Sequence, residues 1–136
     1  MRSLLLDTCA LIVLTEKARV AAAAVEAMRA ARDGGITYIS PISAWEVGTL
    51  VSRGRLQLLI RPERWFANLF DASGVQLADL SPDLLIASSY LPGNPPNDPT
   101  DRILAATARE LGATLVTRDR ALLDYGAQGH MSVVAC

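Results

Sequence analysis

Four acidic residues, Asp7, Glu46, Asp101 and Asp119, each end or follow a short apolar run and open a helical pattern. In an open α/β sheet the carboxyl ends of the strands border one crevice, so we expect these four carboxylates to gather there. Two carboxylates about 5 Å apart repel by roughly 3 kcal/mol at an effective dielectric constant near 20. A divalent cation removes that repulsion, and oxygen ligands suit Mg²⁺ or Mn²⁺. The sequence therefore predicts a metal site made of these acids.

Three of the acids also have a purely structural interpretation. Glu46 can complete a capping box with Ser43, while Asp101 and Asp119 lie where a helix N-terminus attracts an anion. Asp7 differs because it follows a buried apolar strand, where a carboxylate is costly unless it is paired or bound to a cation. The metal hypothesis therefore depends most on Asp7.

The predicted site favours phosphodiester hydrolysis over other phosphate chemistry. Zinc is disfavoured because His130 is the only histidine, and Cys9 and Cys136 are expected to be free thiols. The chain has neither a GxxxxGK[ST] loop nor a GxGxxG motif after its first strand. A phosphoacceptor domain of the receiver type would need a lysine after a late strand, and the only lysine is Lys17.

Alternating apolar runs and helical patterns predict the elements that position the acids. The pattern is typical of a three-layer α/β sandwich with a central, mainly parallel sheet of four to five strands. With 136 residues, we expect a single domain over 1–136. The predicted strands are 3–6, 36–39, 74–78, 114–117 and 132–135.

Capping and breaking residues set the predicted helix ends. Thr8 is expected to be the N-cap of a helix over 9–14, and Asp98 the N-cap of a helix that ends at Gly112. The remaining helices are predicted over 16–32, from about 41 to Gly54, over 62–70, over 81–90 and after Asp119, with a further short element at 55–60 and a loop at 92–97.

The composition of the chain gives no sign of a membrane protein or of a strongly charged partner. The net charge of −1 gives no overall attraction to nucleic acid. No stretch resembles a secretory signal peptide or approaches the roughly 18 apolar residues of a membrane-spanning helix. We therefore expect a cytoplasmic protein without a membrane partner.

The segments LLLDTCALIVL, ISAWEVGTLVSRGRLQL and NDPTDRILAATARELGATLVTRD resemble PIN domains, in particular the VapC toxins of bacterial toxin–antitoxin pairs. The resemblance implies a PIN-like fold and a Mg²⁺- or Mn²⁺-dependent endoribonuclease. It implies that Asp7, Glu46, Asp101 and Asp119 are catalytic, and that the three aspartates hold the metal. Thr8 and Thr117 would position water or phosphate. Arg102 would reach substrate phosphate or, as we prefer, pair with a neighbouring acid.

The same resemblance implies three partners: an RNA substrate, a VapB-type antitoxin and a second copy of the chain in a homodimer. Apolar side chains that we predict at such surfaces, with ordinary core as the alternative, are Trp45, Leu50, Leu56, Leu58 and Leu59. A rival function is a catalytically inactive PIN-fold module that binds a partner or RNA.

Overall fold

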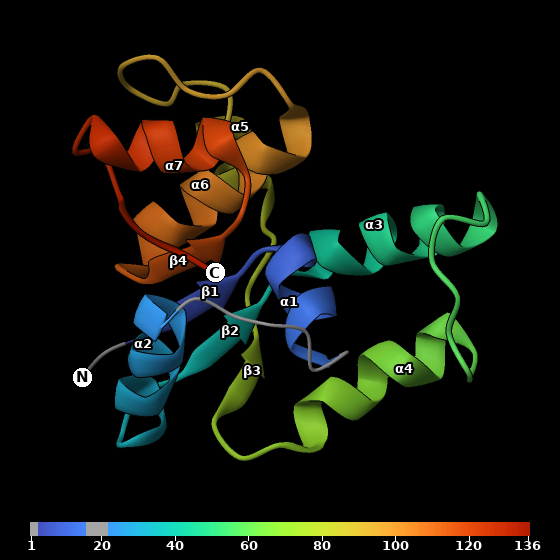
Figure 1. Ribbon diagram of the computed structural model, residues 1–136. Helices are drawn as coiled ribbons and strands as arrows, with labels where there is room; N and C mark the ends of the chain where they lie inside the picture. Colours follow the sequence, from blue (N-terminus) through green and yellow to red (C-terminus); the bar gives the residue numbers. More distant parts are fainter. Residues whose placement is uncertain (1–2, 16–21) are drawn as a thin grey trace.

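The computed structural model describes residues 3–15 and 22–136 (Figure 1). Within these residues five strands form one sheet in the order β3-β2-β1-β4-β5, and every neighbouring pair is parallel. The strands are β1 (Leu4–Leu6), β2 (Thr37–Ile39), β3 (Val75–Leu77), β4 (Thr114–Thr117) and β5 (Ser132–Ala135). The prediction of a mainly parallel sheet is confirmed, and all five predicted strands are present.

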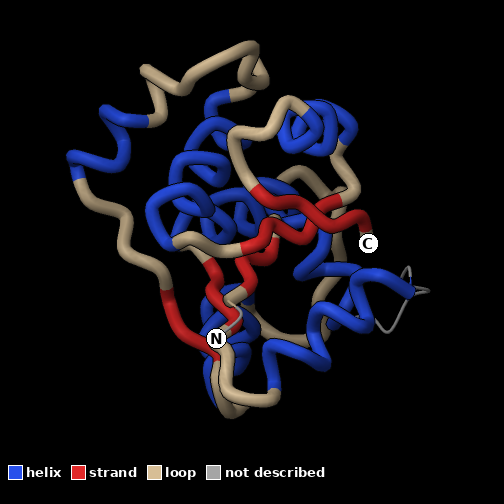
Figure 2. Tube along the Cα trace, turned by 90° about the vertical axis from the view of Figure 1, so that its left-hand side faces the viewer, coloured by secondary structure: helices blue, strands red, loops and turns tan. Residues whose placement is uncertain are grey.

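Helices cover both faces of the sheet. Figure 2 shows the strands in red between helices in blue. Their bounds are α1 (Thr8–Thr15), α2 (Ala22–Arg32), α3 (Pro41–Ser52), α4 (Pro62–Asn68), α5 (Pro82–Ala87), α6 (Pro99–Leu111) and α7 (Arg120–Ala127), with a 3₁₀ turn at Leu69–Asp71. Four of them begin with proline, whose missing N–H is harmless in the first turn.

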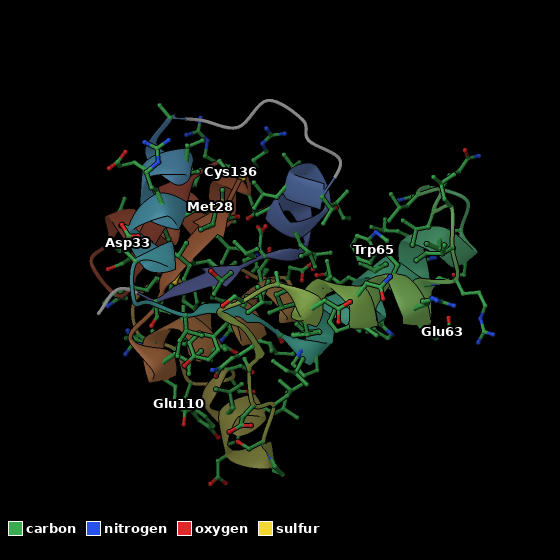
Figure 3. All side chains as sticks on the ribbon, turned by 90° about the horizontal axis from the view of Figure 1, so that it is seen from below. Met28, Asp33, Glu63, Trp65, Glu110 and Cys136 are labelled. Carbon is green, nitrogen blue, oxygen red and sulfur yellow. The ribbon has the colours of Figure 1, made fainter. Side chains whose placement is uncertain are left out.

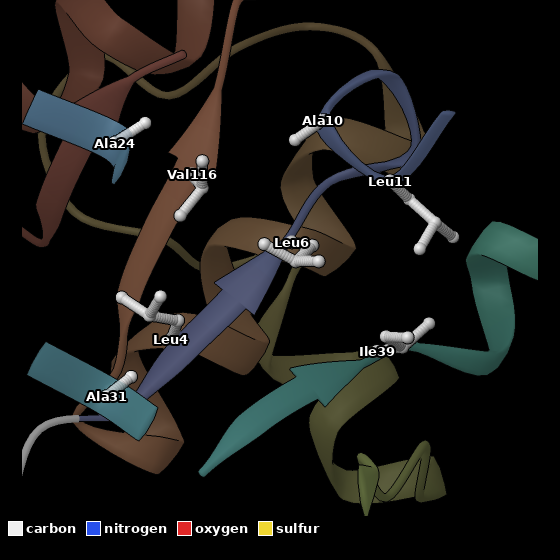
Figure 4. Packing of buried hydrophobic residues seen from close by; sticks show 8 residues of the cluster. All are labelled: Leu4, Leu6, Ala10, Leu11, Ala24, Ala31, Ile39 and Val116. Atoms are coloured by element: carbon white, nitrogen blue, oxygen red, sulfur yellow. The ribbon is translucent and has the colours of Figure 1, made fainter. Parts of the chain in front are cut away.

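Successive residues of β1 point to opposite faces and so divide the core in two. Leu4 and Leu6 pack in one cluster with Ala10, Leu11 and side chains of α2 and β2 (Figure 4). Leu5 belongs to a second cluster, whose other buried members come from α6, β4, α7 and the residue before β4, Ala113. This arrangement of helix, sheet and helix is the predicted three-layer sandwich.

Several predicted boundaries need correction. The helix predicted over 16–32 is present from Ala22, and residues 16–21 lie outside the described residues. The helix predicted to reach Tyr90 ends at Ala87, because the last turn tightens into i→i−3 bonds from Ser89 to Ile86 and from Tyr90 to Ala87. The short element predicted at 55–60 is irregular backbone. It follows Gly54, whose φ of 70° ends the helical path of α3.

Helices α3 and α4 and the segment between them form an arm, defined here as residues 41–68. Figure 1 shows the arm leaving the body beside α1, and Figure 3 shows it from below with Trp65 and Glu63 labelled. The base of α3 lies against α1, and α4 returns along α3. A search of the described helices found none long and apolar enough to cross a membrane.

Candidate metal centre

The site lies where the chain changes direction across the sheet. From β1 the chain continues to β2 on one side, whereas β4 pairs with β1 on the other side. Ligands of open α/β sheets bind beyond the carboxyl ends of the strands at such a switch point. Asp7 follows β1 directly, and Thr117 is the last residue of the neighbouring β4. The strand order therefore brings the two residues together.

Asp7 is 4% exposed and both of its carboxylate oxygens accept hydrogen bonds. The Ala10 N–H donates to Oδ1 at 2.7 Å, and the Thr117 hydroxyl donates to Oδ2. Burial raises the pKa of Asp7, while these two hydrogen bonds lower it. Asp7 thus caps α1, so the prediction of Thr8 as N-cap is wrong, and Asp7 does have a structural role.

Thr8 connects α1 to α3. Its hydroxyl donates to Glu46 Oε1 and lies 3.0 Å from Ser43 Oγ. Glu46 therefore does not close a capping box on Ser43. The cap of α3 is Ser40, whose Oγ accepts from the Ile42 N–H at 3.1 Å. Burial raises the pKa of Glu46 above its ordinary value, while the hydrogen bond from Thr8 lowers it.

Asp98 and Asp101 have different roles at the start of α6. Asp98 Oδ1 accepts from the N–H groups of Thr100 and Asp101 at 2.8 and 3.2 Å, which confirms it as the cap. Asp101, in the same first turn, is half-buried. The pKa of Asp101 is raised to about 7. Burial is the largest cause, and the charge of Asp119 is the next, followed by those of the other nearby acids.

Asp119 extends the hydrogen bonds of Asp7 to α7. Its N–H donates to Thr117 Oγ1 at 2.9 Å, and the Thr117 hydroxyl in turn donates to Asp7. Asp119 Oδ2 accepts from the Leu122 N–H at 3.0 Å and so caps α7. The structural role that the sequence allowed for Asp119 is therefore present, alongside its place beside the other acids.

Each of the predicted acids acts electrostatically on the same region. The pKa of Asp101 is raised by burial first, and then by charges that include Asp119, Glu46 and Asp7. However, in the arrangement seen here no three or more carboxylate, imidazole or thiol groups of the described residues stand close enough to hold one ion directly. Mg²⁺ usually keeps several waters and takes one or two carboxylates. The all-oxygen donor set fits that mode of binding.

Within the protein, Arg102 binds backbone carbonyls and not a neighbouring acid, while its contact with substrate phosphate stays a prediction. Its guanidinium donates to three backbone carbonyls: Ser88 and Pro96, each at 3.0 Å, and Ser89 at 3.3 Å. The preferred prediction, an ion pair with a neighbouring acid, is therefore wrong. Arg102 instead ties the residues after α5 to the loop that leads into Asp98 and Asp101.

Two residues of the α7 end hold the same loop and were not predicted. The Tyr125 hydroxyl donates to the Pro92 carbonyl at 2.7 Å. The Gln128 amide accepts from the Asn94 N–H at 2.9 Å and donates to the Asn94 carbonyl at 3.1 Å. A side chain at Gly93 would collide with His130. Single residues of these types carry no sequence pattern, so only the fold reveals this contact.

An apolar groove of about 410 Å³ lies between the arm and α1. The lining residues are Ile12, Thr15, Leu56, Gln57, Leu58, Leu59, Ile60 and Trp65. Leu59 is fully exposed, and Trp45 on α3 is 63% exposed. Some of the five predicted apolar side chains are therefore exposed at the surface, as we expected. Trp45 and Leu50 lie on α3, whereas Leu56, Leu58 and Leu59 lie on the irregular segment after it.

Comparison with known proteins gives one family and one fold. The PIN domain family profile matches residues 4–128. Ribonuclease VapC22 of Mycobacterium tuberculosis is 36% identical over 87 residues, which cover 64% of this chain and 65% of that protein. The chain thus matches slightly less than two thirds of that relative's length.

Two solved structures share the fold at low sequence identity. The VapBC2 complex of Rickettsia felis bound to a promoter DNA fragment aligns over 98% of both chains, with 17% identity and a TM-score of 0.66. FitAcB of Neisseria gonorrhoeae aligns over 96% of this chain and 95% of its own, with 20% identity and a TM-score of 0.53. With the profile match over almost the whole chain, these findings show that the protein belongs to the PIN-domain family.

Proposed function

We propose that the chain is a Mg²⁺- or Mn²⁺-dependent endoribonuclease and the toxin of a VapBC-type toxin–antitoxin pair. The observation that carries the proposal is the geometry at the switch point of the sheet, where hydrogen bonds to Thr117 join Asp7 to Asp119. Beside them, burial and then the charges of nearby acids raise the pKa of Asp101 to about 7. Strongly shifted pKa values of this kind are concentrated at functional sites. The PIN family membership and the relative named Ribonuclease VapC22 support RNA as the substrate.

Asp7, Asp101 and Asp119 would hold the ion, directly or through water. When bound, the ion supplies Lewis-acid chemistry: it neutralises charge on the phosphodiester and makes hydroxide available near neutral pH. Thr117 fixes the Asp7 carboxylate, and Thr8 fixes Glu46 through Oε1. Glu46 Oε2 is then the atom that accepts the proton of the attacking water.

The partners follow from two apolar surfaces. The groove between the arm and α1 is open and apolar, and we assign it to the C-terminal part of a VapB-type antitoxin. The exposed side chains of Leu85, Ile86 and Tyr90 on and after α5 form a second surface, which we assign to a homodimer.

The rival function is an inactive PIN-fold module that binds a partner or RNA. A scaffold without metal has no reason to keep a half-buried carboxylate, Asp101, whose pKa is raised by burial and then by repulsion from neighbouring acids. The pair of assays that separates the two functions uses the purified full chain. Thermal unfolding with Mn²⁺ reports on metal binding, and incubation of total RNA with Mg²⁺ or with EDTA reports on cleavage.

We expect Mn²⁺ to stabilise the chain, RNA to be cleaved only with a divalent ion, and Asp101→Asn to lose both effects. Asp83→Asn is the matched control, because Asp83 also lies in the first turn of a helix that begins with proline but is exposed. RNA binding without cleavage or metal stabilisation would favour the inactive module.

A further inference from the structure

The outer part of the arm, residues 53–64, has a charge opposite to that of the rest of the molecule. Residues 53–64 contain Arg53, Arg55, Arg61 and Arg64, and Glu63 is their only acid. The segment therefore carries +3, and since the whole chain carries −1, the remaining residues carry −4. All four arginines are exposed. Protein surfaces ordinarily mix the two signs, so this separation sets the segment apart.

Three of these arginines have no side-chain partner among the residues that the structure describes. Arg61 forms an exposed ion pair with Glu63 at 2.8 Å. The guanidinium groups of Arg53, Arg55 and Arg64 make no hydrogen bond or ion pair with any described residue. Arginine presents a planar fork of donors that matches phosphate oxygens. These groups are therefore free to bind an anion without breaking an existing contact.

The arm connects the basic segment directly to the acidic site. Helix α3 contains Glu46, which the Thr8 hydroxyl holds at the site, and it runs outward to Ser52 (Figure 1). At 1.5 Å per residue, Arg53 lies about 10 Å beyond Glu46 along the helix axis. An acidic crevice by itself repels a polyanion, so a nearby segment of positive charge has to supply the attraction.

We infer that residues 53–64 bind the phosphate backbone of the RNA substrate a few nucleotides from the scissile bond. The inference rests on the proposed ribonuclease function and assigns the substrate a second contact outside the acidic site. Arginine contacts to phosphate hold the strand without reading its bases. Loss of one such contact with single-stranded nucleic acid lowers the salt dependence of log K by about 0.7 and the affinity at 0.1 M salt roughly fivefold.

The binding test uses the full chain with Asp101→Asn to prevent cleavage, Mg²⁺, and a fluorescein-labelled single-stranded RNA followed by anisotropy. Arg53→Gln with Arg55→Gln is the arm variant. Arg29→Gln with Arg109→Gln is the control, because it removes the same charge from exposed positions on α2 and α6. We expect roughly 25-fold weaker binding at 0.1 M salt and a slope reduced by about 1.4 for the arm variant only.

Cleavage kinetics in the chain that keeps Asp101 distinguish the possible failures. We expect the arm variant to raise KM and keep kcat, since the acidic site is intact. An arm variant that binds and cleaves like the control overturns the inference and leaves the ribonuclease function standing. If neither the unaltered chain nor its variants bind or cleave RNA, both fail. An arm variant that loses binding of poly-glutamate but keeps its RNA affinity identifies the segment as a protein-binding surface, which also overturns the inference.

Discussion

Replacement of Asp101 by asparagine is expected to stabilise the metal-free protein, although it removes a charged group from the first turn of a helix. The carboxylate is half-buried, and burial together with the charges of Asp119 and other acids raises its pKa to about 7. Asparagine keeps the shape and the polarity of the side chain without the charge. The gain should therefore be small at a pH of about 4 and should grow as the pH rises toward the folded-state pKa of Asp101.

The size of the gain follows from the pKa of Asp101. A rise from 3.8 to about 7 corresponds to an upper limit of about 4 kcal/mol. Because the side chain is only half-buried, solvent screening reduces this figure to about 1–2 kcal/mol. The lost interaction with the helix dipole takes back about 0.3–1 kcal/mol. A net gain of about 1 kcal/mol remains, or about 3–5 °C in Tm for a chain of this size.

The pH dependence has a defined sign. Asp101 ionises near 3.8 in the unfolded chain but only near 7 in the folded chain. The contribution of a raised carboxyl pKa to stability is present at low pH and is lost as the pH rises from about 4 to 7. The advantage of Asp101→Asn should therefore be small near pH 4.5 and complete above pH 7.

Urea unfolding in EDTA at pH 5 and pH 8 measures this difference. Asp98→Ala is the contrasting variant, because loss of a real N-cap should cost about 1 kcal/mol at pH 5. At pH 8 part of that cost should be offset, because Asp98 no longer repels the ionised Asp101. Asp83→Asn is the matched control and should lose only a few tenths of a kcal/mol. A loss of stability for Asp101→Asn at pH 8, or an equal gain at both pH values, would refute the reasoning.

Three further predictions test the supports of the site and the packing around it. Thr117→Val should cost about 1–3 kcal/mol by urea unfolding, because Asp7 loses the hydroxyl that donates to it. Thr117→Ser keeps that hydroxyl and should cost only its buried methyl group, about 0.8 kcal/mol. Gly126→Ala should cost about 1–3 kcal/mol because its Cβ collides with Val133, and Val133→Ala should relieve that cost in a double-mutant cycle. Arg102→Lys should make the 88–97 segment more sensitive to limited proteolysis, because lysine lacks the fork that holds three carbonyls; unchanged cleavage would contradict this role.

Much of the fold could be predicted because local patterns agree with the tertiary structure. Strand β1 is an uninterrupted apolar run with all three residues buried, and β4 has two buried apolar residues at its centre, as expected for strands covered on both faces. Pro99 and Gly112 mark the ends of α6, since proline suits a first turn and the φ of 63° at Gly112 suits a residue without a side chain. These signals do not depend on distant partners.

The predictions that were wrong concern side chains whose hydrogen-bond partners lie far away in the sequence. The Asp7 carboxylate has a structural role because Thr117, from the neighbouring strand, donates to it. Arg102 binds backbone carbonyls in the segment after α5, and the sequence pattern had wrongly predicted the first residues of that segment as helix. Glu46 accepts a hydrogen bond from the Thr8 hydroxyl and does not form the predicted capping box with Ser43. Periodicity and capping rules describe near neighbours only, so they could not give these contacts.

The rate of RNA cleavage as a function of Mg²⁺ concentration tests the central claim most directly. It compares the unaltered chain with Asp7→Asn, Asp101→Asn and the exposed control Asp83→Asn on one single-stranded RNA. If the acids form a metal-dependent ribonuclease site, the rate should rise with Mg²⁺ to a plateau for the unaltered chain and Asp83→Asn. The two site variants should stay near the background rate. Equal Mg²⁺-dependent rates for Asp7→Asn, Asp101→Asn and the unaltered chain would contradict the account.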